Sequence, residues 1–423
     1  MPILSALIPF PSTRYREGSQ LKRQKFKSRE SLRMNYNFDT VMDRTSNFAA
    51  KYDELGKKFG RDDLIPLWVA DMDFKVAEPI TRAILDRAEQ GIFGYTSRPD
   101  SYFQAVQQWL ESRQGWKADT QLMIHCPGVV PTLSLYIQCF TQPGDKIIIQ
   151  PPVYYPFFDV VRSNGRTLVE NPLKNVNGHY EMDYDHLEKV AKNGAKLLLL
   201  CSPHNPVGRV WKKEELVRLG EICLAHGIRV IADEIHSDLI FFGHKHTPFA
   251  AISEEFRQNT ISCIAPSKTF NLAGLQASVA IFPTLGERDK FDRLLGSLDI
   301  RRNNCFSLVA TEAAYRHGGE WLAQVKAYIE DNFLYIQDYC REYMPKIQPN
   351  LPEGTYLVWI DCRRLGLDKN ELHSFMINKA KIALDDGFWF SDDYAGYMRL
   401  NAACPRAIIS RALHQWKTAL TQI

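Results

Sequence analysis

Residues 197–236 read LLLLCSPHNPVGRVWKKEELVRLGEICLAHGIRVIADEIH, and this stretch is the most direct indication of the fold class. Its two apolar runs, residues 197–201 and 228–232, predict strands that are buried on both faces. Between them, apolar side chains recur at helical spacing over residues 212–226, and Gly227 marks the end of that helix. A strand, a helix and a second strand in this order predict a parallel pair joined by a right-handed crossover.

The same pattern continues on both sides of this stretch. Residues 146–150 and 261–264 are further apolar runs rich in branched side chains, so we expect a mostly parallel sheet covered by helices. After about Arg316 the pattern changes to a long helical segment over residues 321–343 and a strand-like run over 354–360. The chain is therefore predicted to be an α/β protein, with a large parallel-sheet domain and a smaller α+β domain at its C-terminal end.

Four consecutive regions are expected along the chain: a basic, disordered extension over residues 1–33, an N-terminal segment over 34–80 that packs with the small domain, a large domain over 81–316 and a small domain over 317–423. The extension carries eight basic and two acidic side chains, a balance of +6, whereas the remaining 44 basic and 47 acidic residues leave −3. A basic arm can bind nucleic acid or anionic lipid. We expect instead a solvated extension, or an upstream start with Met34 as the working first residue.

Composition excludes several classes of protein. The chain has 423 residues, of which 45% are hydrophobic and 24% charged, as is usual for globular proteins. No stretch approaches the ~20 consecutive apolar residues of a membrane span, and the apolar start of the chain lacks the charged flank of a signal peptide. Nine cysteines are widely separated with no C-x-x-C pair, which predicts reduced thiols, a cytoplasmic location and no metal site.

Polar residues that follow the predicted strands are the candidate functional residues, because ligands bind at the carboxyl ends of the strands in open parallel sheets. Asn205 lies in a Pro-rich loop with its amide free to donate, and Asp233 places a carboxylate where an apolar run ends. Lys268 is surrounded by small and apolar residues, where desolvation would lower its pKa and make its amine nucleophilic. A solvated lysine and a helix-capping aspartate remain the ordinary alternatives.

Two further groups extend this set. Residues 127–134 precede an apolar helical stretch that ends at Phe140, and exposed backbone amides at the start of a helix suit a phosphate group, although a glycine before a helix is a weak signal by itself. Arg399 lies on a strand-like segment and could hold a carboxylate through two parallel hydrogen bonds. A lysine, a carboxylate, an amide, a phosphate cradle and an arginine together meet the requirements of pyridoxal phosphate acting on an amino acid.

Seven motifs, in this order along the chain, resemble those of the fold type I pyridoxal-phosphate enzymes of the class I/II aminotransferase superfamily, and within it the MalY/PatB-type cystathionine β-lyases. They span the chain from about Asn35 to the C-terminus. The motifs are WVADMDF (68–74), GYT (94–96), PPVYYP (151–156), SPHNPVG (202–208), DEIH (233–236), SKTFNLAGL (267–275) and RLNAACPR (399–406).

The resemblance implies a role for each candidate residue. Lys268 would form the Schiff base with pyridoxal 5'-phosphate, Asp233 would pair with the ring nitrogen, and Asn205 would donate to the ring 3-oxygen. The other implied contacts are stacking by Tyr154, phosphate binding by the amides of Val129 and Val130 with Ser267, phosphate binding across a homodimer interface by Tyr95, and binding of the substrate α-carboxylate by Arg399.

Two positions depart from the pattern of many relatives. Ala265 and Gln276 stand where those relatives have a serine and a basic residue that bind the phosphate, so phosphate binding is expected to depend on Ser267, backbone amides and Tyr95. His236 stands where many aminotransferases have a tyrosine, and no proton-transfer role is assigned to it.

The resemblance favours carbon–sulfur β-elimination of cystathionine or a related β-thio amino acid, giving pyruvate, ammonia and a thiol. Lys268 would be the general base, and Asp233 would keep the ring nitrogen positive. Two alternatives stay open: an aminotransferase, and a regulatory binding protein with residual lyase activity, because some members of this branch modulate a transcription regulator by protein contact. We expect an amino-acid substrate and a homodimer, and neither a membrane nor a nucleic acid as partner.

Overall fold

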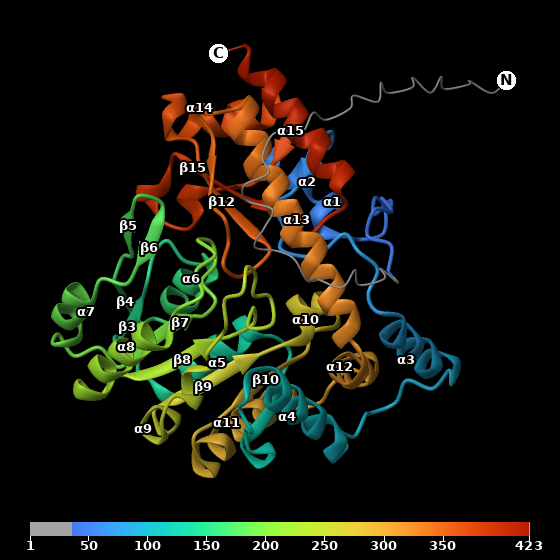
Figure 1. The fold of residues 1–423 in the computed structure, drawn as a ribbon. Helices are drawn as coiled ribbons and strands as arrows, with labels where there is room; N and C mark the ends of the chain where they lie inside the picture. Colours follow the sequence, from blue (N-terminus) through green and yellow to red (C-terminus); the bar gives the residue numbers. More distant parts are fainter. Residues whose placement is uncertain (1–35, 423) are drawn as a thin grey trace. The chain divides into compact units, whose positions relative to one another are not determined.

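A seven-stranded sheet forms the centre of the part of the chain that the computed structural model describes, residues 36–422 (Figure 1). Its strands, in spatial order, are β2 (Met123–Cys126), β10 (Ser278–Ile281), β9 (Thr260–Ile264), β8 (Arg229–Asp233), β7 (Leu197–Cys201), β3 (Lys146–Ile149) and β4 (Thr167–Glu170). The five strands from β9 to β4 run parallel, whereas β10 is antiparallel to both of its neighbours. The predicted mostly parallel sheet is confirmed.

Alternate residues of the central strands face two separate hydrophobic cores. In β7, Leu197 and Leu199 belong to one core, and Leu198 and Leu200 to the other. The first core includes side chains of α5 (Val129–Phe140), α6 (Pro156–Arg162) and α11 (Leu285–Ser297), and the second includes side chains of α7 (Tyr184–Ala191) and α8 (Lys213–Ala225). Because helices cover both faces, the whole of β7 is apolar and buried instead of alternating.

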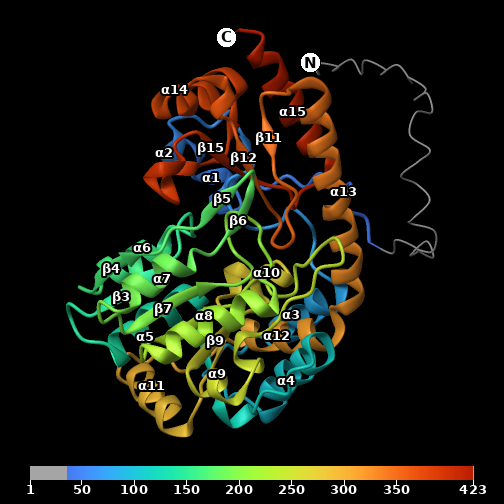
Figure 2. The same ribbon diagram turned by 60° about the vertical axis from the view of Figure 1, so that its left-hand side comes forward.

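A smaller antiparallel sheet comes from the C-terminal part of the chain. Its strands, in spatial order, are β11 (Gln348–Pro349), β12 (Leu357–Asp361), β15 (Tyr397–Asn401) and β14 (Asp385–Asp386). The long helix α13 (Gly319–Tyr343) contacts β11 and packs against α15 (Arg406–Leu420). Both views show α13 extending from this sheet toward the seven-stranded one (Figures 1 and 2).

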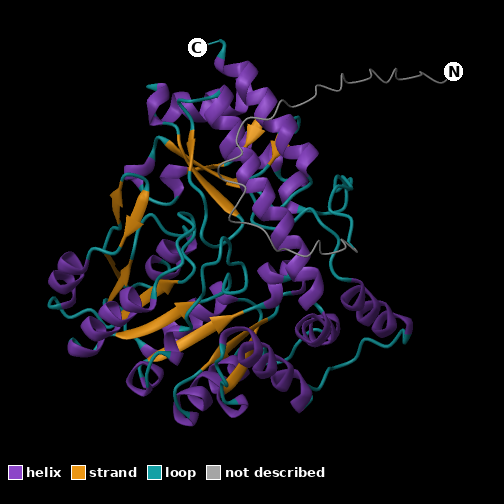
Figure 3. Cartoon of the chain, viewed as in Figure 1, coloured by secondary structure: helices purple, strands orange, loops and turns teal. Residues whose placement is uncertain are grey.

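The remaining elements connect or flank the two sheets (Figure 3). β1 (Ile65–Pro66) pairs in parallel with β13 (Ile382–Ala383), which brings the beginning of the described chain beside its C-terminal part. β5 (Lys174–Val176) and β6 (His179–Glu181) form a hairpin. The other helices are α1 (Ala50–Asp53), α2 (Leu55–Phe59), α3 (Glu78–Glu89), α4 (Asp100–Gln114), α9 (Glu254–Gln258), α10 (Pro266–Thr269), α12 (Cys305–His317) and α14 (Lys369–Ser374).

Most predicted elements agree with the structure to within one or two residues. The difference at β12 is larger, because this strand begins at Leu357 and not at residue 354. Thr355 has a φ of 67° and donates its N–H to the Leu239 carbonyl at 2.9 Å, so the backbone is not extended there. The basic extension predicted for residues 1–33 lies outside the described residues. Within residues 36–422, no helix combines the length and hydropathy needed to cross a bilayer.

Candidate active site

A cavity of about 190 Å³ lies where β7, β8 and β9 end, in agreement with the rule for open parallel sheets. Seven of the nine predicted site residues line it: Val129, Val130, Tyr154, Asn205, Asp233, Ser267 and Lys268. The structure thus brings together residues from two loops, a strand end and two helices that are up to 139 positions apart in the chain, from Val129 to Lys268. Arg399 and Tyr95 do not line this cavity.

Lys268 lies on α10, the single helical turn that directly follows β9. Its Nζ donates a hydrogen bond to the carbonyl of Ala70 at 2.6 Å. Burial of the amine lowers the pKa of Lys268 to about 8, although the Asp71 carboxylate acts in the opposite direction. About a tenth of the amine is therefore uncharged at pH 7, far more than for a lysine with an ordinary pKa, as suits a nucleophile or general base.

Asp233 is the last residue of β8 and is 4% exposed. Its Oδ1 accepts a hydrogen bond from the backbone N–H of Ile235 at 3.1 Å, and it forms no ion pair with any described residue. Burial raises the pKa of this carboxyl to about 7, because the charged form has lost its hydration. A buried carboxylate that faces a cavity without a cationic partner suits a ligand that brings a cation of its own, such as a protonated ring nitrogen.

Asn205 is oriented by Arg399, which is 2% exposed. Nη1 of Arg399 donates to Oδ1 of Asn205 at 3.0 Å, and Nη2 donates to the Trp68 carbonyl at 3.1 Å. Nη2 also forms an ion pair with Oδ2 of Asp385. With its oxygen engaged by Arg399, the Asn205 amide has its Nδ2 hydrogens left to donate.

The start of α5 forms another wall of the cavity. The first backbone N–H groups of a helix have no partner within the helix, and those of Val129 and Val130 lie at the cavity wall beside Gly128. Ser267 and Gln276 also line the cavity, whereas Ala265 is buried in the core of the large sheet. An amine, an unpaired carboxylate, a free amide and free helix amides together match the functional groups of pyridoxal phosphate.

Tyr95 lies apart from this cavity and is 94% exposed. It contributes to a separate hollow of about 360 Å³, and the Arg302 guanidinium lies 5.4 Å from the centre of its ring. Within one chain, then, the structure does not bring Tyr95 to the other predicted residues. A role at the cavity would require a second copy of the chain.

Residues 68–74, one of the seven sequence motifs, make contacts with the site that the sequence did not predict. The Ala70 carbonyl accepts from both Lys268 and the Tyr356 hydroxyl, the latter at 2.7 Å. The side chain of Asn271 bonds to the backbone of Met72 and Phe74, and that of Asn401 bonds to the carbonyls of Val69 and Asp71. The motif itself was a signal of function. The groups that accept the hydrogen bonds are backbone carbonyls, however, and the residue type does not show which carbonyls will be used.

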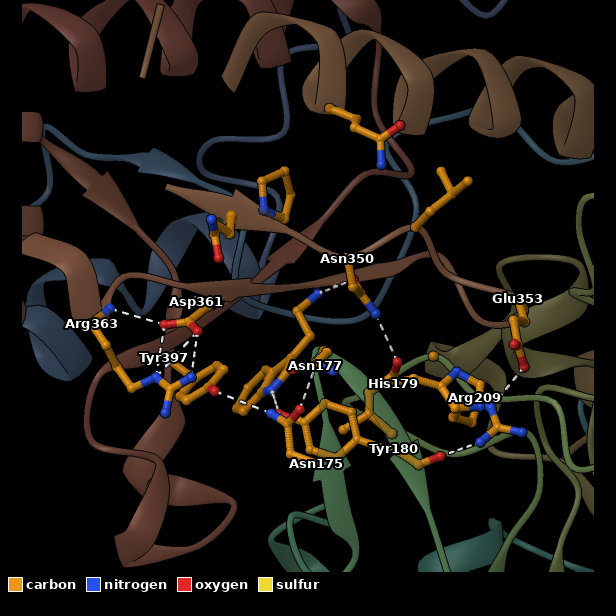
Figure 4. Close-up of a pocket in the computed structure, with 18 of the residues that line it drawn as sticks. Asn175, Asn177, His179, Tyr180, Arg209, Asn350, Glu353, Asp361, Arg363 and Tyr397 are labelled. Carbon is orange, nitrogen blue, oxygen red and sulfur yellow. Dashed lines mark hydrogen bonds and ion pairs between the residues drawn. The ribbon is translucent and has the colours of Figure 1, made fainter. Parts of the chain in front are cut away.

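A larger hollow of about 1020 Å³ lies between the β5–β6 hairpin and the small sheet (Figure 4). Its charged side chains are largely paired with one another: Arg363 with Asp361, and Arg209 with Glu353 at 2.9 Å. None of its lining residues is a lysine, and none has a buried polar atom left without a partner. The smaller cavity is therefore the candidate active site, despite its size.

Comparison with known proteins gives matches over most of the chain. The model of the family "Aminotransferase class I and II" matches residues 62–415. Cystathionine beta-lyase PatB of Bacillus subtilis (strain 168) is 44% identical over 386 residues, which cover 91% of this chain and 100% of the relative.

Solved structures are similar over comparable lengths. A pyridoxal-phosphate-bound protein of Clostridium difficile 630, described as a candidate aminotransferase, has a TM-score of 0.90 and 49% identity, and covers 91% of this chain and 100% of its own. Cystalysin from Treponema denticola, which contains pyridoxal 5'-phosphate, has a TM-score of 0.89 and 36% identity, with 92% and 100% covered. The C-S lyase of Staphylococcus hominis has a TM-score of 0.87 and 32% identity, with 92% and 99% covered.

Proposed function

Because this chain belongs to the aminotransferase class I and II family, we propose that it is a pyridoxal-phosphate-dependent carbon–sulfur β-lyase. Its substrate is cystathionine or a related β-thio amino acid, and its products are pyruvate, ammonia and a thiol. The observation that carries this proposal is the cavity in which Lys268 and Asp233 lie together, in a chain 44% identical to a cystathionine β-lyase over 386 residues.

The chain's own groups would hold the cofactor as follows. Lys268 binds it covalently, Asp233 pairs with its ring nitrogen, and the Nδ2 group of Asn205 donates to its 3-oxygen. Tyr154 stacks on the ring, and the phosphate takes hydrogen bonds from Ser267 and from the amides of Val129 and Val130. The bound cofactor supplies an electron sink conjugated to the substrate Cα.

Lys268 moves the protons of the reaction. The substrate amine would replace Lys268 on the cofactor, and the freed Lys268 amine, whose pKa burial lowers to about 8, would then take the proton from the substrate Cα. The bond between Cβ and sulfur then breaks, and the electron pair leaves with the thiolate. Lys268, now an ammonium, is placed to return the proton to that sulfur. Asp233 stays ionised beside the ring nitrogen throughout, because the partner cation offsets the cost of burying its charge.

Arg399 binds the substrate α-carboxylate, and its hydrogen bond to Asn205 links the substrate site to the cofactor site. A planar guanidinium with several N–H groups suits a carboxylate better than a lysine would. This arrangement fixes the substrate Cα near Lys268.

The enzyme acts as a homodimer in which Tyr95 reaches the phosphate site of the partner subunit. Ile92, Phe93 and Tyr95 are 76%, 59% and 94% exposed, an apolar segment that a second copy would cover. The partner's phosphate site gains the hydroxyl that its own chain does not supply. All nine cysteines are free thiols, which supports a location in the cytoplasm.

An aminotransferase is the second candidate, favoured by the 49% identity to a protein described in that way. Both reactions begin with the same proton transfer to Lys268, and they diverge only afterwards. A regulatory protein partner is compatible with either activity, because binding such a partner would not require the groups in the cavity.

The test is incubation of the purified protein with cystathionine, with and without an added keto acid. We expect pyruvate and a free thiol to form at the same rate in both mixtures. Consumption of cystathionine that requires the keto acid and releases no thiol would identify an aminotransferase, and the absence of any reaction would overturn both proposals. Serine, which has no sulfur leaving group, is the control substrate.

A further inference from the structure

Arg399 and Asp385 form a buried ion pair within the small sheet. The two residues are direct partners in the register of β15 and β14, and they are 2% and 1% exposed. Nη2 of Arg399 pairs with Oδ2 of Asp385. The other atoms of the pair, Nε of Arg399 and Oδ1 of Asp385, are also buried but have no hydrogen-bond partner among the described residues.

The pair is electrically neutral, and the other acceptors around Arg399 are uncharged. They are the Asn205 side-chain oxygen and the Trp68 carbonyl, at 3.0 and 3.1 Å. Asp385 is the carboxylate that neutralises Arg399, since it forms the one ion pair of this guanidinium within residues 36–422. A substrate carboxylate that binds Arg399 therefore adds a negative charge beside a guanidinium that Asp385 already neutralises.

Within residues 36–422, no cation other than Arg399 forms an ion pair with Asp385. Arg399 faces Asp385 from β15, and Lys58 acts on it from α2, but Lys58 is exposed and lies over the Trp389 ring at 4.0 Å. Asp386, the next residue of β14, adds a negative charge and is bound to Nδ1 of His373 at 2.8 Å.

Among the described residues, Tyr154 and Tyr155 are the remaining titratable groups that interact electrostatically with Asp385. Burial raises the pKa of both phenols, so they stay uncharged. A proton is therefore the simplest source of compensating charge.

We propose that Asp385 pairs with Arg399 while the substrate is absent, and that it takes up a proton when the substrate α-carboxylate binds to Arg399. Asp385 is thus a positioning residue: it holds the guanidinium in the neutral pair and makes carboxylate binding dependent on pH. This inference rests on the proposed function, because it takes Arg399 as the substrate-carboxylate site.

The charge state of Asp385 supports the proposal. Burial raises the pKa of this carboxyl to about 6, and the Arg399 charge only partly opposes that effect. A second carboxylate nearby raises the pKa further, because two negative charges share one site. Above about pH 6, binding of a ligand carboxylate to Arg399 therefore requires that Asp385 takes up a proton from solution. The affinity for that ligand then falls by as much as about tenfold per pH unit.

The test uses the holoenzyme and 2-aminoisobutyrate, an amino acid without a Cα proton, which can bind but cannot react further. Its Kd is measured from the change in visible absorbance between about pH 6 and pH 9. The amino group of the probe titrates as well, so the measured quantity is the ratio of the wild-type Kd to that of Asp385→Asn. We expect this ratio to rise by as much as about tenfold per pH unit.

Asp386→Asn is the matched control, because Asp386 is buried on the same strand but bonds to His373 and not to Arg399. Its Kd should keep the wild-type slope against pH, with the slope beginning at a lower pH because the negative charge of Asp386 no longer raises the pKa of Asp385. A ratio of wild-type Kd to Asp385→Asn Kd that does not change with pH would overturn the proposal. So would an Asp386→Asn variant whose ratio changes with pH as strongly as that of Asp385→Asn.

A second measurement does not depend on the variant folding. Infrared difference spectra of the wild-type holoenzyme on addition of propionate, a carboxylate without an amine, should show the stretch of a newly protonated carboxyl group. The same band should appear with Asp386→Asn, and its absence from the wild type would contradict proton uptake. Failure of the proposed lyase activity is distinguishable, since both readouts report binding and neither needs product.

Discussion

At the scale of single residues, the site depends on burial that shifts two pKa values in opposite senses. Burial lowers the pKa of Lys268 to about 8 and raises that of Asp233 to about 7. Each shift disfavours the charged form of the group, and each side chain faces the same cavity. Groups whose pKa values are moved in this way are typical of catalytic sites.

Lys268→Ala should remove the visible absorbance of the bound cofactor and lower turnover by at least about a thousandfold, because the covalent link and the base are lost together. Absorbance spectra with and without borohydride provide the measurement. Lys379→Ala, at an exposed lysine outside the cavity, is the control and should retain the wild-type spectrum. A band still reducible by borohydride in Lys268→Ala would assign the link to another lysine.

Asp233→Asn should change how the stability of the cofactor-free protein depends on pH. The pKa of Asp233 is raised from 3.8 to about 7 in the fold, so its contribution is present below about pH 4 and is lost as pH rises to about 7. Over this window the wild type should lose up to about 4 kcal/mol relative to Asp233→Asn. Urea unfolding at several pH values measures the difference, and a constant difference would contradict the raised pKa.

At the scale of elements, a segment without regular structure connects the two sheets at the site. Residues 68–74 accept hydrogen bonds from Lys268 and Asn271, which follow β9, and from Arg399 and Asn401, which belong to β15. Residues that follow a strand of the large sheet and residues of the small sheet thus bond to the same short backbone segment. Its carbonyls set the location of both Lys268 and Arg399.

Asn271→Ala should lower the free energy of unfolding by about 2 to 4 kcal/mol, because three hydrogen bonds to the backbone of Met72 and Phe74 are lost and partly buried groups stay unpaired. Thermal and urea unfolding provide the measurement. Asn378→Ala, which removes one exposed bond to Ser374, should change stability by less than about 0.5 kcal/mol. Equal effects of the two variants would mean that residues 68–74 are not held through Asn271.

At the scale of the whole molecule, the cavity and the exposed segment around Tyr95 are separate features of one chain. The proposed homodimer unites them, and Gln276 at the cavity wall adds no positive charge for a phosphate. A hydroxyl from the partner subunit would then matter more than usual, since hydrogen bonds to charged groups contribute about 1.5 to 3 kcal/mol.

Tyr95→Phe should weaken cofactor binding by roughly ten- to a hundredfold without lowering the stability of the subunit, because only a hydroxyl that faces outward is removed. Equilibrium dialysis of the cofactor and light scattering are the measurements. Mixed dimers of Tyr95→Phe and Lys268→Ala subunits provide the sharper test, since one of their two sites keeps both groups. An active monomer, or mixed dimers without a site of wild-type affinity, would contradict shared sites.

The large sheet could be predicted from the sequence, because continuous apolar runs such as residues 197–201 satisfy both faces of a covered strand. The sequence also predicted that Lys268, Asp233 and Asn205 lie close together, since each follows one of these runs and the ends of neighbouring parallel strands meet at one edge; their roles stay predictions. The local apolar pattern and the order of the strands were sufficient to predict this sheet and the edge at which these residues meet.

Only the tertiary structure revealed the pairing of Arg399 with Asp385 and the bond from Lys268 to the Ala70 carbonyl. Asp385 lies in a two-residue strand, and Ala70 offers only a backbone oxygen, so neither has a signal in its residue type. Ala70 and Lys268 are 198 positions apart. Such contacts arise when separately formed elements pack, and their geometry depends on the shape of the whole interior and not on any local pattern.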